Sequence, residues 1–311
     1  MTRHLEAEAL DATSSQGPVT TSMARVRPSR WRAARRRPGL ARAIILYAVL
    51  LPGALVFASV FVYALLSAVK PPDEVLSTPI KWLPSQFRWS NFKQPFEQVP
   101  FARYYLNSVV VGIAVTLLNV VTCTLAGYSF SKFAYRGRSL LFLIVMATMM
   151  IPLEVIYVPL YAVVFDLGWV NSFAGLIVPA GTSAFGILLM RQSIDGLPDE
   201  ILDAARLDGA GEMRILARIV APMMGAPLSA LALIVFMATW DSHLWPLLVG
   251  SDDAHRTLPV GLAAMQADNA GTTGIPMLMA AAVMALLPTL ILFVLLQRRF
   301  VQGMTMTADI K

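Results

Sequence analysis

Six long apolar runs dominate this chain, and each is long enough to cross a lipid bilayer as a helix. Crossing the hydrocarbon core takes about 20 apolar residues. Five such runs carry no charged residue, at 43–69, 104–131, 167–190, 219–240 and 269–297. The sixth run, 139–165, is interrupted only by Glu154. This pattern predicts an all-α polytopic membrane protein with six transmembrane helices, at roughly 43–66, 105–130, 139–160, 172–192, 222–246 and 275–297.

The composition agrees with lipid as the main solvent of the chain. Hydrophobic residues make up 57% of the 311 residues and charged residues only 14%, against roughly 25% charged residues in a soluble domain. A water-soluble fold of this length could not hide so much apolar surface. The first run is also too long for a secretory signal, whose apolar region covers about 7–15 residues, so we expect an uncleaved anchor.

Basic residues in the polar stretches predict the orientation. They crowd the N-terminal stretch and recur after the second, fourth and sixth predicted helices, at Arg25, Arg27, Arg30, Arg32, Arg35, Arg36, Arg37, Lys132, Arg136, Arg138, Arg206, Arg214, Arg218, Arg298 and Arg299. The positive-inside rule makes this face cytoplasmic. We therefore expect a multi-pass protein of the bacterial cytoplasmic membrane with both termini in the cytoplasm.

The N-terminal basic cluster has two readings. A basic run is a feature of nucleic-acid binding, but one directly before an apolar helix favours contact with anionic membrane lipid, and we expect no nucleic acid. These polar residues show no apolar periodicity, which is typical of disorder. The predicted organisation is a disordered cytoplasmic tail at 1–40, a membrane domain at 41–298 and a cytoplasmic C-terminal tail at 299–311.

One connection does not follow the charge rule. The segment 67–104 carries five basic residues, although the topology places it outside. It also bears six tryptophan and phenylalanine residues, at Trp82, Phe87, Trp89, Phe92, Phe96 and Phe101. Aromatic side chains gather where membrane meets water, so we expect a partly helical external segment that rests on the membrane interface.

A polar island at 196–222 separates the fourth and fifth predicted helices. It holds three arginines and five carboxylates. Pro198 suits the first turn of a helix, and Gly209 suits the left-handed residue that ends one. A second amphipathic helix at about 211–220 leads into Pro222. The island is therefore predicted to be a helix–turn–helix unit in water, held at both ends by membrane helices.

The first helix of the island has the features of a docking helix. Ile201, Leu202 and Ala205 form an apolar stripe at helical spacing, and small alanines let a partner's groove approach the backbone closely. The alternative is an amphipathic helix lying on the bilayer. That alternative requires large apolar residues with Lys/Arg flanks, whereas this helix is rich in Ala and Asp.

The island resembles the "EAA" loop of permeases from binding-protein-dependent ABC importers. The matching residues are Asp203, Ala204, Ala205, Gly209, Ile219 and Pro222. The form from Ala204 to Ala210 is similar to the carbohydrate branch, the maltose-type permeases. The residues that the resemblance marks for docking an ATPase are Ile201, Leu202, Asp203, Ala204, Ala205, Asp208, Gly209, Ala210, Ile219 and Pro222. Asp203 stands where the family has Glu, Leu216 where Phe is common and Ala221 where Leu is usual.

Further pieces of the resemblance follow in the same order, over about residues 40–311. They are Asn91-Phe92 through Asn107-Ser108, Met150-Ile151-Pro152 with Pro159-Leu160-Tyr161, Trp240-Asp241 with Trp245-Pro246-Leu247, and Thr257 to Leu262. The family implies a second, related permease, a pair of ATPase subunits, an extracellular sugar-binding protein and a sugar substrate. In that arrangement the 198–209 helix couples ATPase closure to the switching of the pathway.

Sites for other chemistry are missing from the sequence. No Gly-x-x-x-x-Gly-Lys-Ser/Thr loop occurs, so ATP and Mg²⁺ are expected on the partner ATPase rather than on this chain. With Cys123 as the lone cysteine, neither an internal disulfide nor a cysteine-based metal site can form. No metal-ligand spacing and no nucleophile–base pair stand out. We expect a non-catalytic subunit without a bound cofactor.

A few polar and aromatic residues near the spans are candidates for lining the pathway. Ionisable residues inside spans are functional suspects, which marks Glu154, and the cluster Trp240, Asp241, His243 and Trp245 offers aromatic faces with polar edges. The structural alternatives are a wet helix break at Glu154 and an interfacial tryptophan belt. A rival function is a self-sufficient ion-coupled carrier that uses Glu154, Asp241 and His243 as a proton relay. A membrane enzyme or signalling anchor is disfavoured because no catalytic site or soluble domain is visible.

Overall fold

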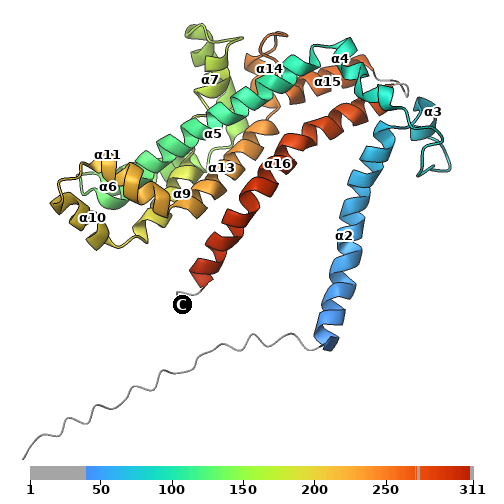
Figure 1. Ribbon diagram of the computed structural model, residues 1–311. Helices are drawn as coiled ribbons and strands as arrows, with labels where there is room; N and C mark the ends of the chain where they lie inside the picture. The colour runs from blue at the N-terminus through green and yellow to red at the C-terminus, as the bar shows by residue number, and fades with distance from the viewer. Residues whose placement is uncertain (1–39, 270, 272–273, 309–311) are drawn as a thin grey trace, which may run out of the picture. The chain divides into compact units, whose positions relative to one another are not determined.

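The computed structural model describes residues 40–269, 271 and 274–308, and every regular element in these ranges is helical (Figure 1). The stretch 25–37, with its predicted role in orientation, lies outside the described residues. The contacts within the chain divide it after Leu55 into two compact units. Apart from the first part of the helix that begins at Leu40, all features discussed below belong to the second unit, from Val56 onward.

Three helices are continuous and apolar enough to cross a membrane. They are α2 (Leu40–Ala68), α5 (Phe101–Lys132) and α16 (Ile275–Ala308), of which residues 46–68, 101–132 and 275–295 form the apolar parts. α16 continues past the predicted end at 297 and into the expected tail at 299–311. No proline follows Pro288, so nothing stops the backbone hydrogen-bond ladder there.

Two further predicted spans are bent pairs of helices. α6 (Arg138–Thr148) and α7 (Leu153–Asp166) meet at 102°, whereas the apolar pattern predicted one helix over 139–160. The break falls before Pro152, which disfavours helical geometry in the preceding residue. The other pair, 212–223 and α13 (Gly225–Trp240), is bent by 84°. The described residues thus contain three candidate spans, or up to five if each bent pair is one span.

The predicted helix at 172–192 is also interrupted. α8 (Phe173–Ile177) and α9 (Ala184–Asp195) are separated by 178–183, which contains Pro179 and Gly181. Two carbonyls of this break, on Ala180 and Gly181, accept hydrogen bonds of 3.1 and 2.7 Å from Asn119 Nδ2 and Thr122 Oγ1 on α5. Non-helical backbone at membrane depth is tolerated where other groups satisfy it in this way.

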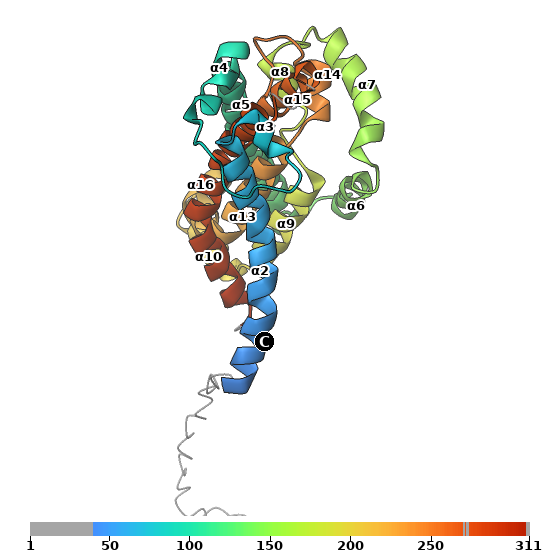
Figure 2. The same cartoon turned by 90° about the vertical axis from the view of Figure 1, so that its right-hand side faces the viewer.

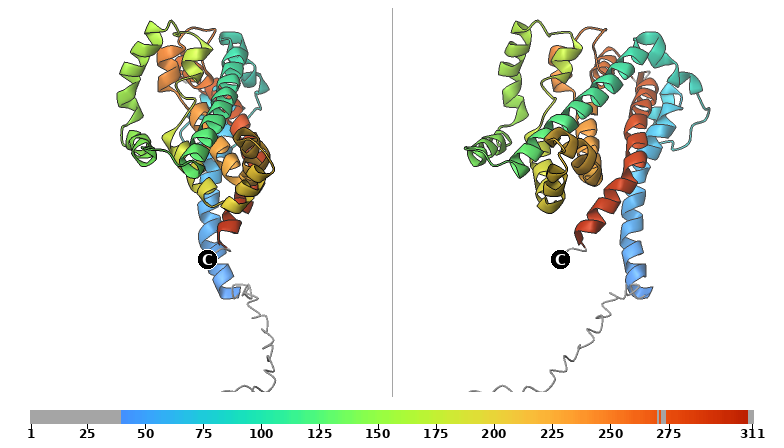
Figure 3. Two further views of the ribbon diagram at one scale, coloured as in Figure 1. Left: turned by 90° about the vertical axis from the view of Figure 1, so that its left-hand side faces the viewer. Right: turned by 60° about the vertical axis from the view of Figure 1, so that its left-hand side comes forward.

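α5 is the element around which this unit is organised, and it packs most extensively against α9 and α13. The close approach to α9 depends on Gly127, where a Cβ would come within 2.8 Å of the Arg191 backbone nitrogen. One end of α5 carries α3 (Pro72–Val75), α4 (Gln94–Gln98) and α15 (Leu258–Asp268) (Figures 1 and 2). The other end carries α6, α10 (Asp199–Leu207) and α11 (Glu212–Ile215), where the polar island lies (Figure 3).

Candidate functional site

α10 is a nine-residue helix whose two ends are both defined by local chemistry. Pro198 precedes it, and Asp199 and Glu200 occupy the first turn, at the positive end of the helix dipole. At the other end Gly209 adopts a φ of 79°. The Ala210 N–H donates to the Ala205 carbonyl and the Gly209 N–H to the Arg206 carbonyl, each at 3.0 Å. These two bonds form a Schellman cap, and they confirm the left-handed turn predicted at Gly209.

The exposed face of α10 differs from the predicted apolar stripe. Leu202 is 1% exposed and Ala205 9% exposed, because both pack into the hydrophobic core of this chain. Ile201 is 41% exposed and Leu207 90% exposed. A helix this short is not stable alone in water, so one apolar face must pack on its own protein. Of the predicted stripe only Ile201 faces outward here, and contact of Ile201, Leu202 and Ala205 with an ATPase stays a prediction.

A different set of side chains faces outward on α10. Ile201, Ala204 and Asp208 are spaced at i, i+3 and i+7, which places them on one side of the helix, and all three are exposed, as is Asp203. Leu207 projects beside them. We call these five residues the exposed face of α10. An apolar side chain left open on a helix can anchor that helix in a hydrophobic groove of a partner.

Lys132, the last residue of α5, fastens the start of α10. Its Nζ lies 2.6 Å from Asp199 Oδ1 and donates to the Leu197 carbonyl at 2.9 Å. The hydrogen bond from Lys132 holds the pKa of Asp199 below its ordinary value. The preceding residue on α5, Ser131, donates from Oγ to Asp195 Oδ1 at 2.6 Å. The start of the island is therefore tied to the end of a membrane helix.

A second link fastens the turn after α10. Arg206 donates from Nε to Glu212 Oε1 and from Nη1 to Asp203 Oδ1, each at 2.8 Å. The hydrogen bond with Glu212 is the largest cause of the raised pKa of Arg206. Glu212 Oε2 also accepts a hydrogen bond of 2.6 Å from Tyr128 Oη on α5. The ion pair closes the turn between α10 and α11, and the tyrosine joins it to the span.

Tyr128, Lys132, Arg206 and Glu212 were not among the predicted site residues. The three arginines and five carboxylates of the island were the available signal, because opposite charges six residues apart can pair across a turn. Tyr128 lies 84 positions from Glu212, and only the tertiary fold brings these two residues together.

The remaining residues of the matched pattern lie at the junction with the next span. Ala210 and Ile219 are half-buried against the core cluster, and Pro222 is exposed. The helix widens to a π turn over 216–220, directly before Pro222. Proline has no N–H to donate to the carbonyl four residues earlier, and a π turn is a common way to absorb such a defect.

The candidate pathway residues are not assembled into one site. Trp240 and Trp245 are buried, and their indole N–H groups donate at 3.1 Å to the carbonyls of Ala285 and Gly175. In this conformation both indoles are packed within the chain, and a pathway-lining role for Trp240 and Trp245 stays a prediction. Glu154 and Asp241 are exposed and His243 is half-buried. Among the described residues no hydrogen bond or ion pair joins these three, and no three His, Cys, Asp or Glu side chains gather as metal ligands.

Comparisons with known proteins agree on one family. A family model described as "Binding-protein-dependent transport system inner membrane component" matches residues 119–306. The arabinooligosaccharides transport system permease protein AraQ of Halalkalibacterium halodurans is 33% identical, over 78% of this chain and 87% of the relative. The sn-glycerol-3-phosphate transport system permease protein UgpE of Yersinia pestis is 32% identical, over 84% and 95%.

A solved structure shares the fold. It is a chain of a bacterial ABC transporter involved in the import of the acidic polysaccharide alginate, and it superposes with a TM-score of 0.73 at 20% sequence identity. The match covers 83% of this chain and 97% of the other. At this identity the likeness shows the overall fold alone.

Proposed function

Because the chain belongs to the family of binding-protein-dependent transport system inner membrane components, we propose that it forms one half of the translocation pathway of an ATP-driven importer for sugars or related polyol compounds. The chain is a multi-pass membrane permease component, and a permease of this family has no catalytic role of its own. The substrate class is supported by the names of two relatives, an arabinooligosaccharide permease and a glycerol-3-phosphate permease.

The partners in this proposal are a second, related permease, a pair of ATPase subunits and an extracellular binding protein. ATP and Mg²⁺ would bind the ATPase subunits, since this sequence has no phosphate-binding loop. Substrate selection would rest largely with the binding protein.

The proposed topology has six crossings and both termini in the bacterial cytoplasm. Three crossings are the continuous helices α2, α5 and α16, two are the bent pairs, and one is the interrupted pair α8 and α9. Residues 1–40 and 299–311 would be cytoplasmic tails and 41–298 the membrane domain. The polar island would then face the ATPase side, in agreement with its three arginines.

The observation that carries the proposed mechanism is the two-sided nature of α10. Leu202 and Ala205 fix it to the core, whereas Ile201, Ala204 and Leu207 are exposed in the part of the chain that the structure describes. Lys132 and Tyr128 tie its two ends to α5. ATPase closure would therefore push α10 and α5 together, since packed elements move as rigid bodies.

Uptake by proteoliposomes tests this proposal. The tagged chain is purified gently with whatever accompanies it, reconstituted with its binding protein and supplied with internal ATP. We expect sugar uptake that stops when ATP is replaced by a non-hydrolysable analogue. Uptake driven by an ion gradient with the purified chain alone would support the carrier instead. That rival needs a relay through Glu154, Asp241 and His243, which the described structure does not bring together.

A further inference from the structure

The segment between α2 and α5, residues 69–100, has a polar interior. Lys70, Glu74 and Asn91 are all buried within it. Asn91 Nδ2 donates to the carbonyls of Ala68 and Lys70 at 2.9 and 3.0 Å, and the ammonium of Lys70 donates to the Lys81 carbonyl. The same ammonium lies 5.0 Å from the ring centre of Tyr63. Polar side chains thus tie distant parts of the segment together from the inside.

Glu74 is the second centre of this polar interior. Its Oε2 accepts the Ser85 N–H at 3.0 Å, and its Oε1 lies 3.3 Å from Lys81 Nζ. These contacts hold residues 81–85 against α3, although Lys81 and Ser85 lie seven and eleven positions after Glu74 in the sequence. The segment is therefore a folded unit with a defined surface.

The outside of this unit is apolar. Its large hydrophobic side chains are between 50% and 74% exposed, and they are Leu76, Ile80, Trp82, Leu83, Phe87, Trp89 and Phe96. Two of them form a row of stacked rings with the half-buried Phe92: Phe87 lies 6.4 Å from Trp89, and Trp89 lies 6.2 Å from Phe92. The inner side of the segment packs against α16. A chain folded for water would place these two classes of side chain the other way round.

Polar side chains inside and apolar side chains outside are the arrangement expected where lipid, and not water, surrounds a segment. We propose that residues 69–100 are built to lie in the headgroup and upper acyl region of the membrane, with Trp82, Leu83, Phe87 and Trp89 inserted among the lipids. This inference rests on the proposed function only in treating α2 and α5 as spans. Both ends of the segment are then fixed at the surface of one leaflet, at Ala68 and Phe101.

Three exposed basic residues favour lipid over a protein partner. Lys81, Arg88 and Lys93 are interleaved with the exposed rings. Alternation of indole rings with ammonium and guanidinium groups is typical of the membrane–water boundary, where the cations reach phosphate groups and the rings sit below them.

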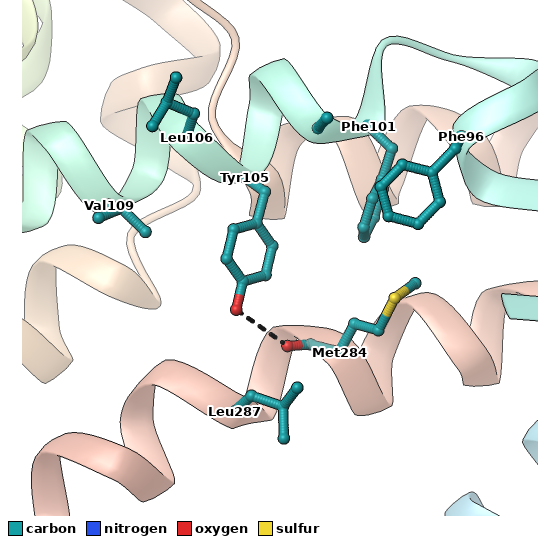
Figure 4. Close-up of a pocket in the computed structure, with 8 residues that line it drawn as sticks. Phe96, Phe101, Tyr105, Leu106, Val109, Met284 and Leu287 are labelled. Atoms are coloured by element: carbon teal, nitrogen blue, oxygen red, sulfur yellow. Dashed lines mark hydrogen bonds between the residues drawn. The ribbon is translucent and has the colours of Figure 1, made fainter. Parts of the chain in front are cut away.

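The apolar surface continues toward the membrane interior. Phe96 on α4 lines a groove of about 530 Å³ with Tyr105 and Leu106 on α5 and Met284 and Leu287 on α16 (Figure 4). Figure 4 shows Tyr105 on α5 facing Met284 and Leu287 on α16, with the Tyr105 hydroxyl directed at the Met284 carbonyl. A groove with this lining offers acyl chains a path from the segment down between two spans.

Spin labels in the intact transporter test the inference. Leu83→Cys and Phe87→Cys are made in a Cys123→Ser background, and the complex is reconstituted in nanodiscs of phosphatidylethanolamine and phosphatidylglycerol. Collisions of each label with oxygen, which concentrates in lipid, are compared with collisions with a water-soluble nickel chelate. Asp73→Cys, at an exposed acidic position of the same segment, is the matched control.

We expect oxygen collisions to exceed nickel collisions several-fold at residues 83 and 87, and the reverse at residue 73. Nickel access equal to that at residue 73 would overturn the inference, and so would exclusion of both reagents, since that means a protein partner covers the surface. ATP-driven uptake is measured on the same preparation. Active uptake with water-exposed labels would refute this inference alone, whereas lipid-exposed labels without ATP dependence would refute the proposed function alone.

Discussion

Tyr128 on the membrane helix α5 donates a hydrogen bond of 2.6 Å from Oη to Glu212 Oε2, directly after the turn that ends α10. The bond connects a 32-residue span to the polar segment that we propose as the ATPase contact. Glu212 at the same time accepts from Arg206 of α10. A displacement of α10 therefore reaches α5 through the ion pair of Arg206 with Glu212 and the hydrogen bond from Tyr128 to Glu212.

Removal of the Tyr128 hydroxyl should weaken coupling between ATP hydrolysis and transport. Tyr128→Phe keeps the ring, which packs edge-on against Phe133 with a centroid distance of 5.5 Å. A lost hydrogen bond of this kind lowers the free energy of unfolding by about 1–2 kcal/mol. We expect near-normal ATPase activity with less substrate imported per ATP. Tyr135→Phe, at an exposed position, is the control, and an unchanged import-to-hydrolysis ratio for Tyr128→Phe would refute the link.

The two faces of α10 should respond differently to substitution. Leu207→Asp changes a 90% exposed side chain, so the fold should be unaffected. If Leu207 is buried against the ATPase in the complex, the affinity for the ATPase should fall by roughly 30-fold or more. Leu202→Ala instead creates a core cavity, with an expected loss of about 2–5 kcal/mol in stability. Melting curves and ATPase pull-down separate the two effects. Normal ATPase binding by Leu207→Asp would mean that the partner uses another face.

Gly209 should tolerate no residue that excludes a left-handed backbone. Its φ is 79°, and no atom lies within 4 Å of where a Cβ would be, so any effect is conformational rather than steric. Gly209→Ala should cost about 1 kcal/mol. Gly209→Pro also loses the N–H that donates to the Arg206 carbonyl and should abolish coupled uptake while the chain still inserts. Gly211→Ala has equal space without a positive φ and should behave like the wild type.

The bond between Lys132 and Asp199 predicts a pH dependence of stability with a definite sign. The folded pKa of Asp199 is lowered from 3.8 by the Lys132 hydrogen bond. Its stabilisation is therefore complete above that ordinary value and is lost as pH falls through the lower folded pKa. The difference in melting temperature between wild type and Asp199→Asn should be constant from about pH 8 to pH 5 and shrink only in stronger acid. A difference that already disappears near neutral pH would show that the carboxylate is not held by Lys132.

The apolar runs predicted the number of long hydrophobic segments better than their continuity. Hydropathy measures the length of a segment, so the bounds of α2 and α5 and the start of α16 were predicted closely. It does not show where the backbone leaves the helix, and the segments with Pro152 or Pro179 are bent or interrupted. Whether all six cross the membrane, and in which orientation, stays a prediction.

At the site, local signals were sufficient for local structure only. Gly209 ends α10 because a left-handed residue is needed there, and that requirement is visible in the sequence. The sequence does not show which way the apolar stripe faces, because Leu202 and Ala205 have the same spacing whether they pack inward or face a partner. Tyr128 and Lys132 lie more than 60 positions from their partners, so only the packing of α5 beside the island reveals them.

Site-specific photo-cross-linking from Leu207 tests the central claim most directly. A benzophenone amino acid replaces Leu207 in the full transporter, which is irradiated in membranes, and the cross-linked product is identified by mass spectrometry. The account predicts a covalent adduct with an ATPase subunit, and no such adduct when the benzophenone replaces Leu76 in the segment 69–100. Adducts from Leu207 to lipid alone, in a transporter that still imports its substrate, would contradict the claim that the exposed face of α10 docks the ATPase.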